Sequence, residues 1–174
     1  MGIFRILDRP AGLRLLAAAM VLPAIAVLAD APLKTAQVRV GKHALRVEIV
    51  ETPEQMAKGL MFREKLGRND GMLFIYDEPG YHSMWMKNTL IPLSVAFIDR
   101  DGAILNIEDM EPKTLDSHTS AGPASYSIEA NKGWFAEKKI KPGDKVTGLP
   151  KGSDPRSGQT PNLPDRLESV WFGV

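Results

Sequence analysis

Residues 82–89 concentrate an imidazole, two thioethers, an indole, an ammonium group, an amide and two hydroxyls in one short stretch. On an extended backbone, alternate side chains point to opposite faces, so His82, Met84, Met86 and Asn88 would share one face. One imidazole with two thioethers is a soft ligand set suited to Cu(I) or Ag(I). One interpretation is therefore a Cu(I) or Ag(I) site formed by His82, Met84 and Met86; no other cofactor is predicted.

A ligand-binding face is the second interpretation of the same stretch. Trp85 stands beside Lys87, Asn88 and Thr89, and an aromatic surface with charged, amide and hydroxyl groups suits a sugar or a peptide. We predict a domain that binds a small ligand or an envelope protein through residues 82–89, joined by two charged residues from elsewhere. The candidate ligand-binding residues are Arg63, His82, Trp85, Lys87, Asn88, Thr89 and Glu129.

A third interpretation is an enzyme. His82 with Glu129 would supply an acid and a base for a hydrolase or transferase acting on cell-envelope material. The sequence has no Gly-rich phosphate loop, paired-histidine zinc motif or nucleophile elbow, and it contains no Cys. We therefore favour a binding domain over an enzyme.

Ordinary packing competes with each of these interpretations. Methionine fills irregular cores well, and same-face neighbours on a strand lie roughly 6.5–7 Å apart, too far to share one ion unaided. Asn88 and Thr89 suit backbone hydrogen bonds at a strand end, and Arg63 suits a structural ion pair with Glu129. The sequence alone leaves these alternatives open.

The surrounding residues predict a mainly β scaffold. Residues 35–40 and 43–50 alternate in polarity around a Gly-Lys turn, which is typical of a hairpin. Thr52 and Gln55 predict a capping box at the start of a short helix, and Asn131 is a candidate cap for a helix through residue 139. In total we expect about eight short strands and two short helices. This is a β-rich α+β pattern, typical of a compact antiparallel sandwich or barrel.

The two ends of the chain differ from this domain. Three arginines precede an apolar run over residues 15–28, followed by small residues, which predicts a secretory signal peptide cleaved after Ala29. The run is shorter than the roughly 20 residues of a membrane-spanning helix. We therefore expect contact with the membrane only during export, to the periplasm or the medium. Residues 30–150 form the predicted domain, and residues 151–174 form a Pro/Gly/Ser-rich tail whose apolar end, Val170-Trp171-Phe172, would dock on the domain or bind a partner.

The charge balance narrows the classes of partner. The chain has 22 Lys or Arg and 21 Asp or Glu, a net charge of +1, and removal of the signal peptide would leave it close to neutral. Binding to nucleic acid through a general electrostatic surface requires a strongly basic face, so we predict no nucleic-acid partner.

Several motifs in a fixed order resemble a known family. They are Gly-Leu-Met-Phe-Arg at 59–63, Gly-Met-Leu-Phe at 71–74, the stretch 82–89, Ile-Pro-Leu at 91–93 and Phe-Ile-Asp at 97–99. Together with Ile128-Glu129 and residues 141–146, they resemble the bacterial and archaeal family called domain of unknown function 192, over roughly residues 38–149. The resemblance implies a single compact, mostly β domain, often exported, with no established activity. The polar positions that match the family are Arg63, His82, Lys87, Asn88, Thr89 and Glu129.

One position departs from the family pattern. Ser94 stands where similar sequences carry an acidic residue. A catalytic or metal-binding role for that carboxylate would be lost in this chain, whereas a role in capping a turn is open to serine.

Overall fold

The computed structural model describes residues 32–150, which form nine strands and two short helices. The strands are β1 (Thr35–Val40), β2 (His43–Val50), β3 (Asp70–Gly80), β4 (Ser83–Met84), β5 (Leu93–Ile98), β6 (Ile104–Met110), β7 (His118–Thr119), β8 (Ala124–Asn131) and β9 (Val146–Thr147). The helices are α1 (Pro53–Lys58) and α2 (Trp134–Glu137). The prediction of a mainly β fold is confirmed.

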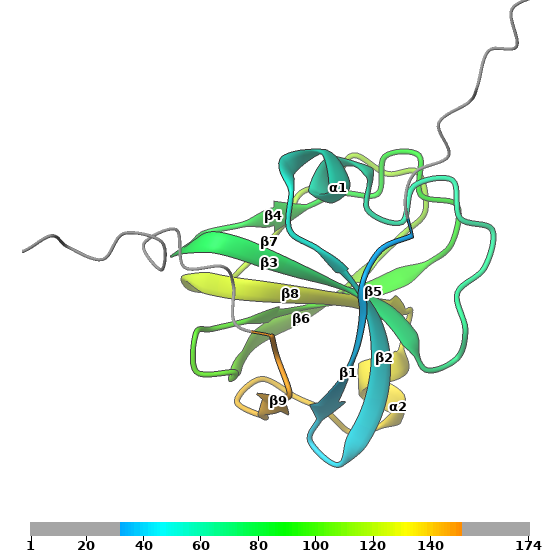
Figure 1. Cartoon of the computed structure of the whole chain (residues 1–174). Helices are drawn as coiled ribbons and strands as arrows, with labels where there is room; N and C mark the ends of the chain where they lie inside the picture. The colour runs from blue at the N-terminus through cyan, green and yellow to red at the C-terminus, as the bar shows by residue number, and fades with distance from the viewer. Residues whose placement is uncertain (1–31, 151–174) are drawn as a thin grey trace, which may run out of the picture. The chain divides into compact units, whose positions relative to one another are not determined.

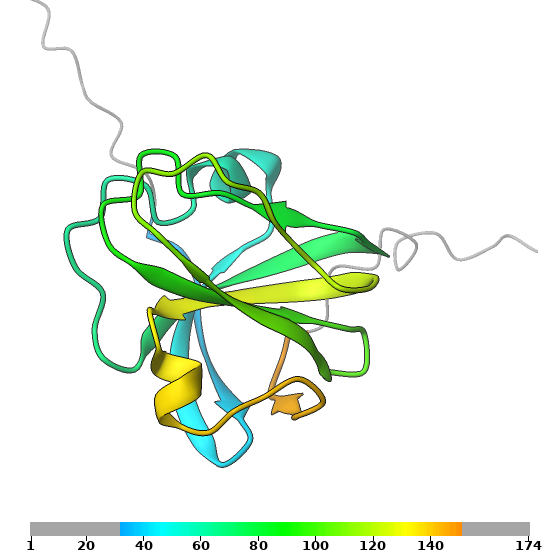
Figure 2. The same ribbon diagram turned by 180° about the vertical axis from the view of Figure 1, so that it is seen from behind.

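Seven of the strands form one sheet in the order β6-β5-β8-β3-β2-β1-β9, and β4 pairs with β7 in a separate ribbon. The large sheet curls into a half-barrel, with α1 and the β4–β7 ribbon at one end and α2 and β9 at the other (Figures 1 and 2). Neighbouring strands pair antiparallel except β2 and β3, which are parallel. The exception arises because the chain crosses over through α1 between these two strands, and parallel pairing requires such a crossover.

Backbone hydrogen bonds bring the two outer strands of the curled sheet together. The amide of Val146 donates to the carbonyl of Gly102 at 2.7 Å, and the amide of Ile104 donates to the carbonyl of Asp144 at 3.0 Å. Gly102 has φ +81°, and a Cβ there would lie 2.5 Å from the Val146 carbonyl oxygen. Glycine is therefore required where the half-barrel closes.

Both faces of the central strands are buried, and they belong to two different cores. Leu73 and Ile128 face one core, which also contains Trp134 and Phe135 of α2. Met72, the residue before Leu73, faces a second core on the opposite side of the sheet. Alternation along each strand produces this division, because successive side chains point to opposite faces.

The cap predicted for the first helix is confirmed, and the cap predicted for the second is wrong. Thr52 accepts a hydrogen bond from the Gln55 amide, and the Gln55 side chain accepts one from the Thr52 amide. Asn131 instead ends β8, and its side-chain amide donates to the Gly67 carbonyl at 2.8 Å. Helix α2 begins later, after Gly133, whose φ of +79° is favourable for glycine.

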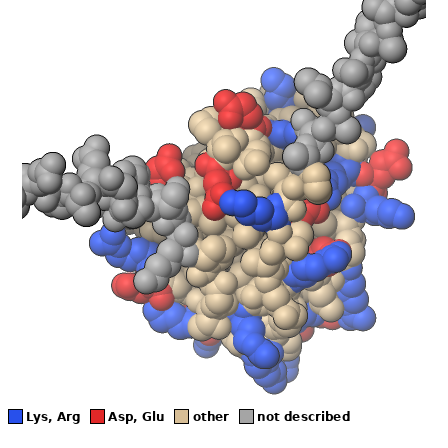
Figure 3. Space-filling view, in the orientation of Figure 1, with Lys and Arg blue, Asp and Glu red and all other residues tan. Residues whose placement is uncertain are grey.

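The predicted signal peptide, residues 1–29, and the predicted tail, residues 151–174 with its apolar end, lie outside the described residues. Among residues 32–150, no helix is both long and apolar enough to span a membrane. On the face shown in Figure 3, basic and acidic side chains together border a central area of other residues.

Candidate functional site

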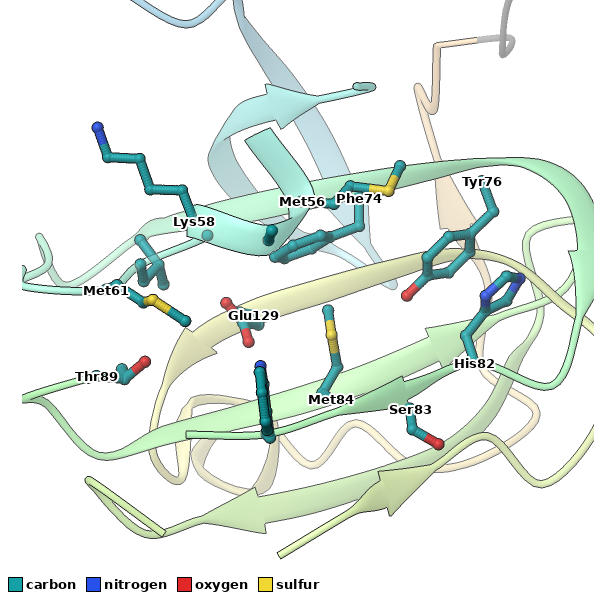
Figure 4. A pocket seen from close by; sticks show the side chains of 14 residues that line it. Met56, Lys58, Met61, Phe74, Tyr76, His82, Ser83, Met84, Thr89 and Glu129 are labelled. Atoms are coloured by element: carbon teal, nitrogen blue, oxygen red, sulfur yellow. The ribbon is translucent and has the colours of Figure 1, made fainter. Parts of the chain in front are cut away.

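A cavity of about 270 Å³ lies on the α1 side of the sheet, bounded by α1, β3, β8 and the stretch that contains β4 (Figure 4). Thioethers and aromatic rings form a large part of its walls. The residues that carry them are Met56, Met61, Met84, Phe74, Tyr76 and Trp85. Such a surface favours an apolar or aromatic ligand body.

Among residues 32–150, Glu129 is the one carboxylic acid that lines this cavity. Its side chain is 5 % exposed, and it has no hydrogen-bond or ion-pair partner among residues 32–150. Its cross-strand neighbours are Met72 on β3 and Val95 on β5, both fully buried and apolar. Burial in this apolar setting raises the pKa of the Glu129 carboxyl from 4.5 to about 8.

Glu129 occupies the middle of a row that runs across the sheet. Pairing registers place Glu48, Met72, Glu129, Val95 and Glu108 side by side on β2, β3, β8, β5 and β6. Three carboxylates therefore alternate with two apolar side chains on one face of the sheet.

The two outer carboxylates have partners within the chain. Both Glu48 oxygens accept hydrogen bonds from the Arg63 guanidinium, at 2.7 and 2.5 Å. One Glu108 oxygen lies 2.9 Å from His118 Nδ1, and the other accepts a hydrogen bond from the Asn106 amide at 3.0 Å. Only the central carboxylate of this row lacks such partners among residues 32–150. The expected ion pair between Arg63 and Glu129 is therefore replaced by one between Arg63 and Glu48.

Tyr76 and His82 add a phenol and an imidazole to the cavity lining. The Tyr76 ring stacks on that of His82, with ring centroids 3.5 Å apart, and the Tyr76 hydroxyl lies 2.9 Å from Ser127 Oγ. Burial raises the pKa of Tyr76 to about 12, with a smaller contribution from the charge of Glu129 and an opposing one from the Ser127 hydrogen bond. The phenol therefore stays protonated near neutral pH and can donate a hydrogen bond.

His82 and Glu129 line the same cavity, as Figure 4 shows, yet no hydrogen bond joins them. The His82 Nε2 atom lies 3.4 Å from the Glu78 carbonyl oxygen, and the His82 ring is held against Tyr76. The structure thus places the two predicted acid–base residues in one site without forming the pair between them.

The alternation predicted for residues 82–89 is present over its first part. Met84 is half-buried at the cavity and Met86 is fully buried in the second core, while Trp85 is 50 % exposed. Lys87 Nζ lies 5.2 Å from the centre of the Trp85 ring, which is half-exposed and also lines the cavity. Of the three predicted soft-metal ligands, Met84 and His82 therefore reach the cavity and Met86 does not.

Alternation ends at Asn88, which has φ +57°. The Asn88 side-chain nitrogen lies 4.0 Å from Met61 Sδ, and the Asn88 backbone carbonyl accepts a hydrogen bond from the Phe62 backbone amide. Thr89 is buried and lines the cavity. Arg63, Lys87 and Asn88 are outside the cavity lining, so the predicted binding residues are divided between the cavity and its surroundings.

Sequence reasoning missed the cavity residues of α1 and β3, among them Met56, Phe74 and Tyr76. One signal was available: Ser125, Ser127 and Glu129 alternate with apolar residues along β8, which marks a polar row on a strand buried on both faces. Among residues 32–150, no group of three His, Asp or Glu side chains is placed to hold a metal ion.

Ser94, the departure from the family pattern, has a structural role here. Its hydroxyl donates to Asp109 at 2.5 Å and accepts a hydrogen bond from the Gly133 amide at 2.8 Å. The serine thus ties β5 to β6 and to the start of α2, away from the cavity lining.

Comparison with known proteins agrees with this fold. A protein described as a candidate transcription regulator, from Sinorhizobium meliloti 1021, is 34 % identical, with a TM-score of 0.66 over 68 % of this chain and 96 % of its own. A protein of unknown function from Novosphingobium aromaticivorans DSM 12444 is 36 % identical, with a TM-score of 0.65 over 78 % of this chain and 99 % of its own. No curated protein matches the chain.

The family comparison agrees with the resemblance found in the sequence motifs. The model of the family DUF192, described as uncharacterized ACR, matches residues 36–148. That range contains every strand and both helices of the described structure except the first residue of β1. The chain therefore belongs to the DUF192 family, whose function is unknown.

Proposed function

We propose that this protein is a small-ligand-binding protein whose site is the cavity beneath α1. The observation that carries the proposal is Glu129, a buried carboxyl that lines the cavity and has no partner among residues 32–150. Buried polar groups are nearly always hydrogen-bonded, and leaving one unsatisfied destabilises the fold. The Glu129 carboxyl opens on the cavity, where a bound ligand would supply its missing hydrogen bonds, and a carboxyl with a raised pKa in a cavity is a candidate for function.

The shape and lining of the cavity support a small ligand rather than a large one. Its volume of about 270 Å³ lies near the lower end of ligand pockets in general. Apolar walls with few polar groups are the usual composition of such pockets, with the polar groups setting the orientation of the ligand. Here the lining residues with polar side chains are Lys58, Tyr76, His82, Ser83, Thr89 and Glu129.

A thermal-shift panel tests the proposal. The probes are phenethylamine, phenethyl alcohol, phenylacetate and N-acetylglucosamine, because they share a small size and differ in charge and polarity. A ligand that binds only the folded state raises Tm. We expect at least one probe to raise Tm of the wild type and to have a smaller effect on Ala57→Phe, which places a bulky ring at a position of α1 that lines the cavity.

Tyr81→Ala is the matched control, because Tyr81 is 71 % exposed and lies outside the cavity lining. It should respond to the probes as the wild type does. The proposal would be wrong if no probe shifts Tm, or if Ala57→Phe responds as strongly as the wild type.

Acid–base catalysis is a second candidate function, favoured by the pKa of Glu129. A carboxyl with a pKa of about 8 exchanges its proton near neutral pH, as a general acid or base must. The envelope-acting hydrolase or transferase that we predicted with His82 and Glu129 would use this group. Hydrolysis of a p-nitrophenyl acetate or p-nitrophenyl glycoside probe that disappears in Glu129→Gln would support it, and equal rates in both proteins would contradict it.

Soft-metal binding also stays a proposal. Met56, Met61 and Met84 line the cavity with His82, so a Cu(I) site there would draw on these sulfur atoms rather than on Met86. Titration of the protein with Cu(I) under reducing conditions tests this: binding that survives Met86→Leu and is weakened by Met84→Leu would support a cavity site.

Export is proposed on the sequence of residues 1–29 alone. A ligand or partner in the cell envelope and a location in the periplasm, or in the medium, follow from that proposal. N-terminal sequencing of the protein from its native host tests it, because cleavage after Ala29 would leave Asp30 as the first residue.

A further inference from the structure

The three carboxylates in the cross-strand row, Glu48, Glu129 and Glu108, differ in their interaction partners. Arg63 meets Glu48 with two hydrogen bonds, and His118 meets Glu108 at 2.9 Å. Each outer carboxylate is thus matched by a basic side chain of the protein, whereas the central one, Glu129, faces the cavity.

The basic groups closest to Glu129 in the site are already engaged. Lys58 lines the cavity, but its side chain extends away from Glu129 (Figure 4) and has an interaction of its own. His82 stacks on Tyr76 and lies against the Glu78 carbonyl. Arg63 is held by Glu48, which lies two strands from Glu129 on the sheet.

We propose that the cavity binds a small primary ammonium ion with an apolar or aromatic body, whose charged nitrogen pairs with Glu129. The inference rests on the proposed function, and it adds the chemical class of the ligand.

The lining matches both parts of such a ligand. A primary ammonium has three N–H donors, and Glu129 offers two oxygen atoms without a donor among residues 32–150. A quaternary ammonium has no N–H group and would leave these oxygens unsatisfied. The rings of Phe74 and Trp85 and the sulfur of Met84 offer contacts to an apolar body, and aromatic faces also attract cations.

Pairing with a cation also offsets the free-energy cost of burying the charged Glu129 carboxylate. A charged hydrogen bond in a desolvated site is stronger than a neutral one. The neutral alternative is a ligand that accepts one hydrogen bond from the protonated carboxyl, and the experiment separates it from the cation.

Isothermal titration with three matched probes tests the inference. They are phenethylamine, phenethyl alcohol, which has the same body without charge, and trimethyl(phenethyl)ammonium, which has charge without N–H donors. The titrations are made at a pH of about 8.5, above the pKa of Glu129 and below the pKa of about 10 of an alkyl amine. We expect phenethylamine to bind at least about tenfold more tightly than either other probe.

Two variants locate the difference. Glu129→Gln keeps the size of the side chain and removes its charge, so it should reduce phenethylamine affinity by at least about tenfold and leave the alcohol unchanged. Tyr81→Ala, outside the lining, should bind all three probes as the wild type does.

The outcomes separate this inference from the proposed function. Equal binding of the amine and the alcohol would overturn the cation while leaving the cavity a ligand site. Tightest binding of the quaternary probe would replace the primary ammonium with an aromatic cation site. Absence of amine binding at millimolar concentration would overturn the inference, and the thermal-shift panel would then decide the proposed function by itself.

Discussion

Arg63 forms a two-pronged ion pair with Glu48, at nitrogen–oxygen distances of 2.7 and 2.5 Å, and not with Glu129. Met72 separates the two glutamates in the cross-strand row. The backbones of these two glutamates lie two strand spacings apart, roughly 9.5 Å, and both printed hydrogen bonds of the Arg63 guanidinium go to Glu48. The choice of Glu48 leaves Glu129 facing the cavity without a charge partner among residues 32–150.

A double-mutant cycle on Arg63→Met and Glu48→Gln should measure this pair. The two side chains are 37 % and 28 % exposed, so we expect a coupling free energy of about 1 kcal/mol in urea denaturation. The Arg46–Asp70 pair is the matched control, since it is also two-pronged but its arginine is 67 % exposed. Its coupling should be smaller and more easily screened by salt. Equal coupling in both pairs would contradict the expected effect of burial.

The stability of the protein should depend on pH through Glu129. Its pKa is about 8 in the folded state and near 4.5 when exposed, so the folded state keeps a proton that the unfolded state loses between these values. The contribution of Glu129 is therefore most favourable below about pH 4.5 and falls by up to about 1.4 kcal/mol per pH unit as the pH rises towards 8.

Urea denaturation of the wild type and Glu129→Gln from pH 5 to 8 measures this contribution. Glutamine does not titrate, so the wild type should lose a few kcal/mol relative to the variant across the series. Subtracting the two curves removes the titration of every other group. Parallel curves would show that Glu129 is ionised in both the folded and the unfolded state across this range, which would contradict its raised pKa.

Gly71→Ala should disturb the strand pair that carries Glu129. A Cβ at Gly71 would lie 2.5 Å from the Glu129 carbonyl oxygen and 3.2 Å from Leu45 Cδ2. Since backbone has to move, we expect a loss of about 1–3 kcal/mol in the free energy of unfolding. Gly122→Ala is the control, because its nearest contact is an ordinary 3.6 Å to Leu105. A neutral effect at Gly71 would mean that β3 and β8 can separate freely.

Removal of the α1 cap should weaken both the helix and the cavity. Thr52→Ala deletes the oxygen that accepts the Gln55 amide hydrogen bond, which costs about 1 kcal/mol at typical N-caps. Because Met56 of α1 lines the cavity, faster hydrogen exchange in α1 should accompany weaker probe binding. Thr52→Ser keeps the hydroxyl and should restore both. Loss of stability without faster exchange in α1 would place the effect elsewhere.

Local patterns in the sequence were sufficient to predict much of the fold. Gly41-Lys42 between two alternating runs determined the β1–β2 hairpin, and Thr52 with Gln55 determined the start of α1, because both signals act over a few neighbouring residues. Asn131 does not cap α2, because its side-chain amide donates a hydrogen bond to the carbonyl of Gly67, which is distant in the sequence. The parallel pairing of β2 and β3 likewise depends on a crossover whose direction no local pattern specifies.

For the candidate site, the sequence likewise identified some features, and others depended on the tertiary structure. The sequence by itself identified His82, Trp85 and Glu129 as unusual side chains and the motifs that place the chain in its family. Only the tertiary structure decided that Arg63 meets Glu48, that Met86 is turned into a core, and that Glu129 faces a cavity. The physical reason is that burial and charge pairing depend on the register between strands distant in the sequence, and that register sets which carboxylate remains without a partner among residues 32–150.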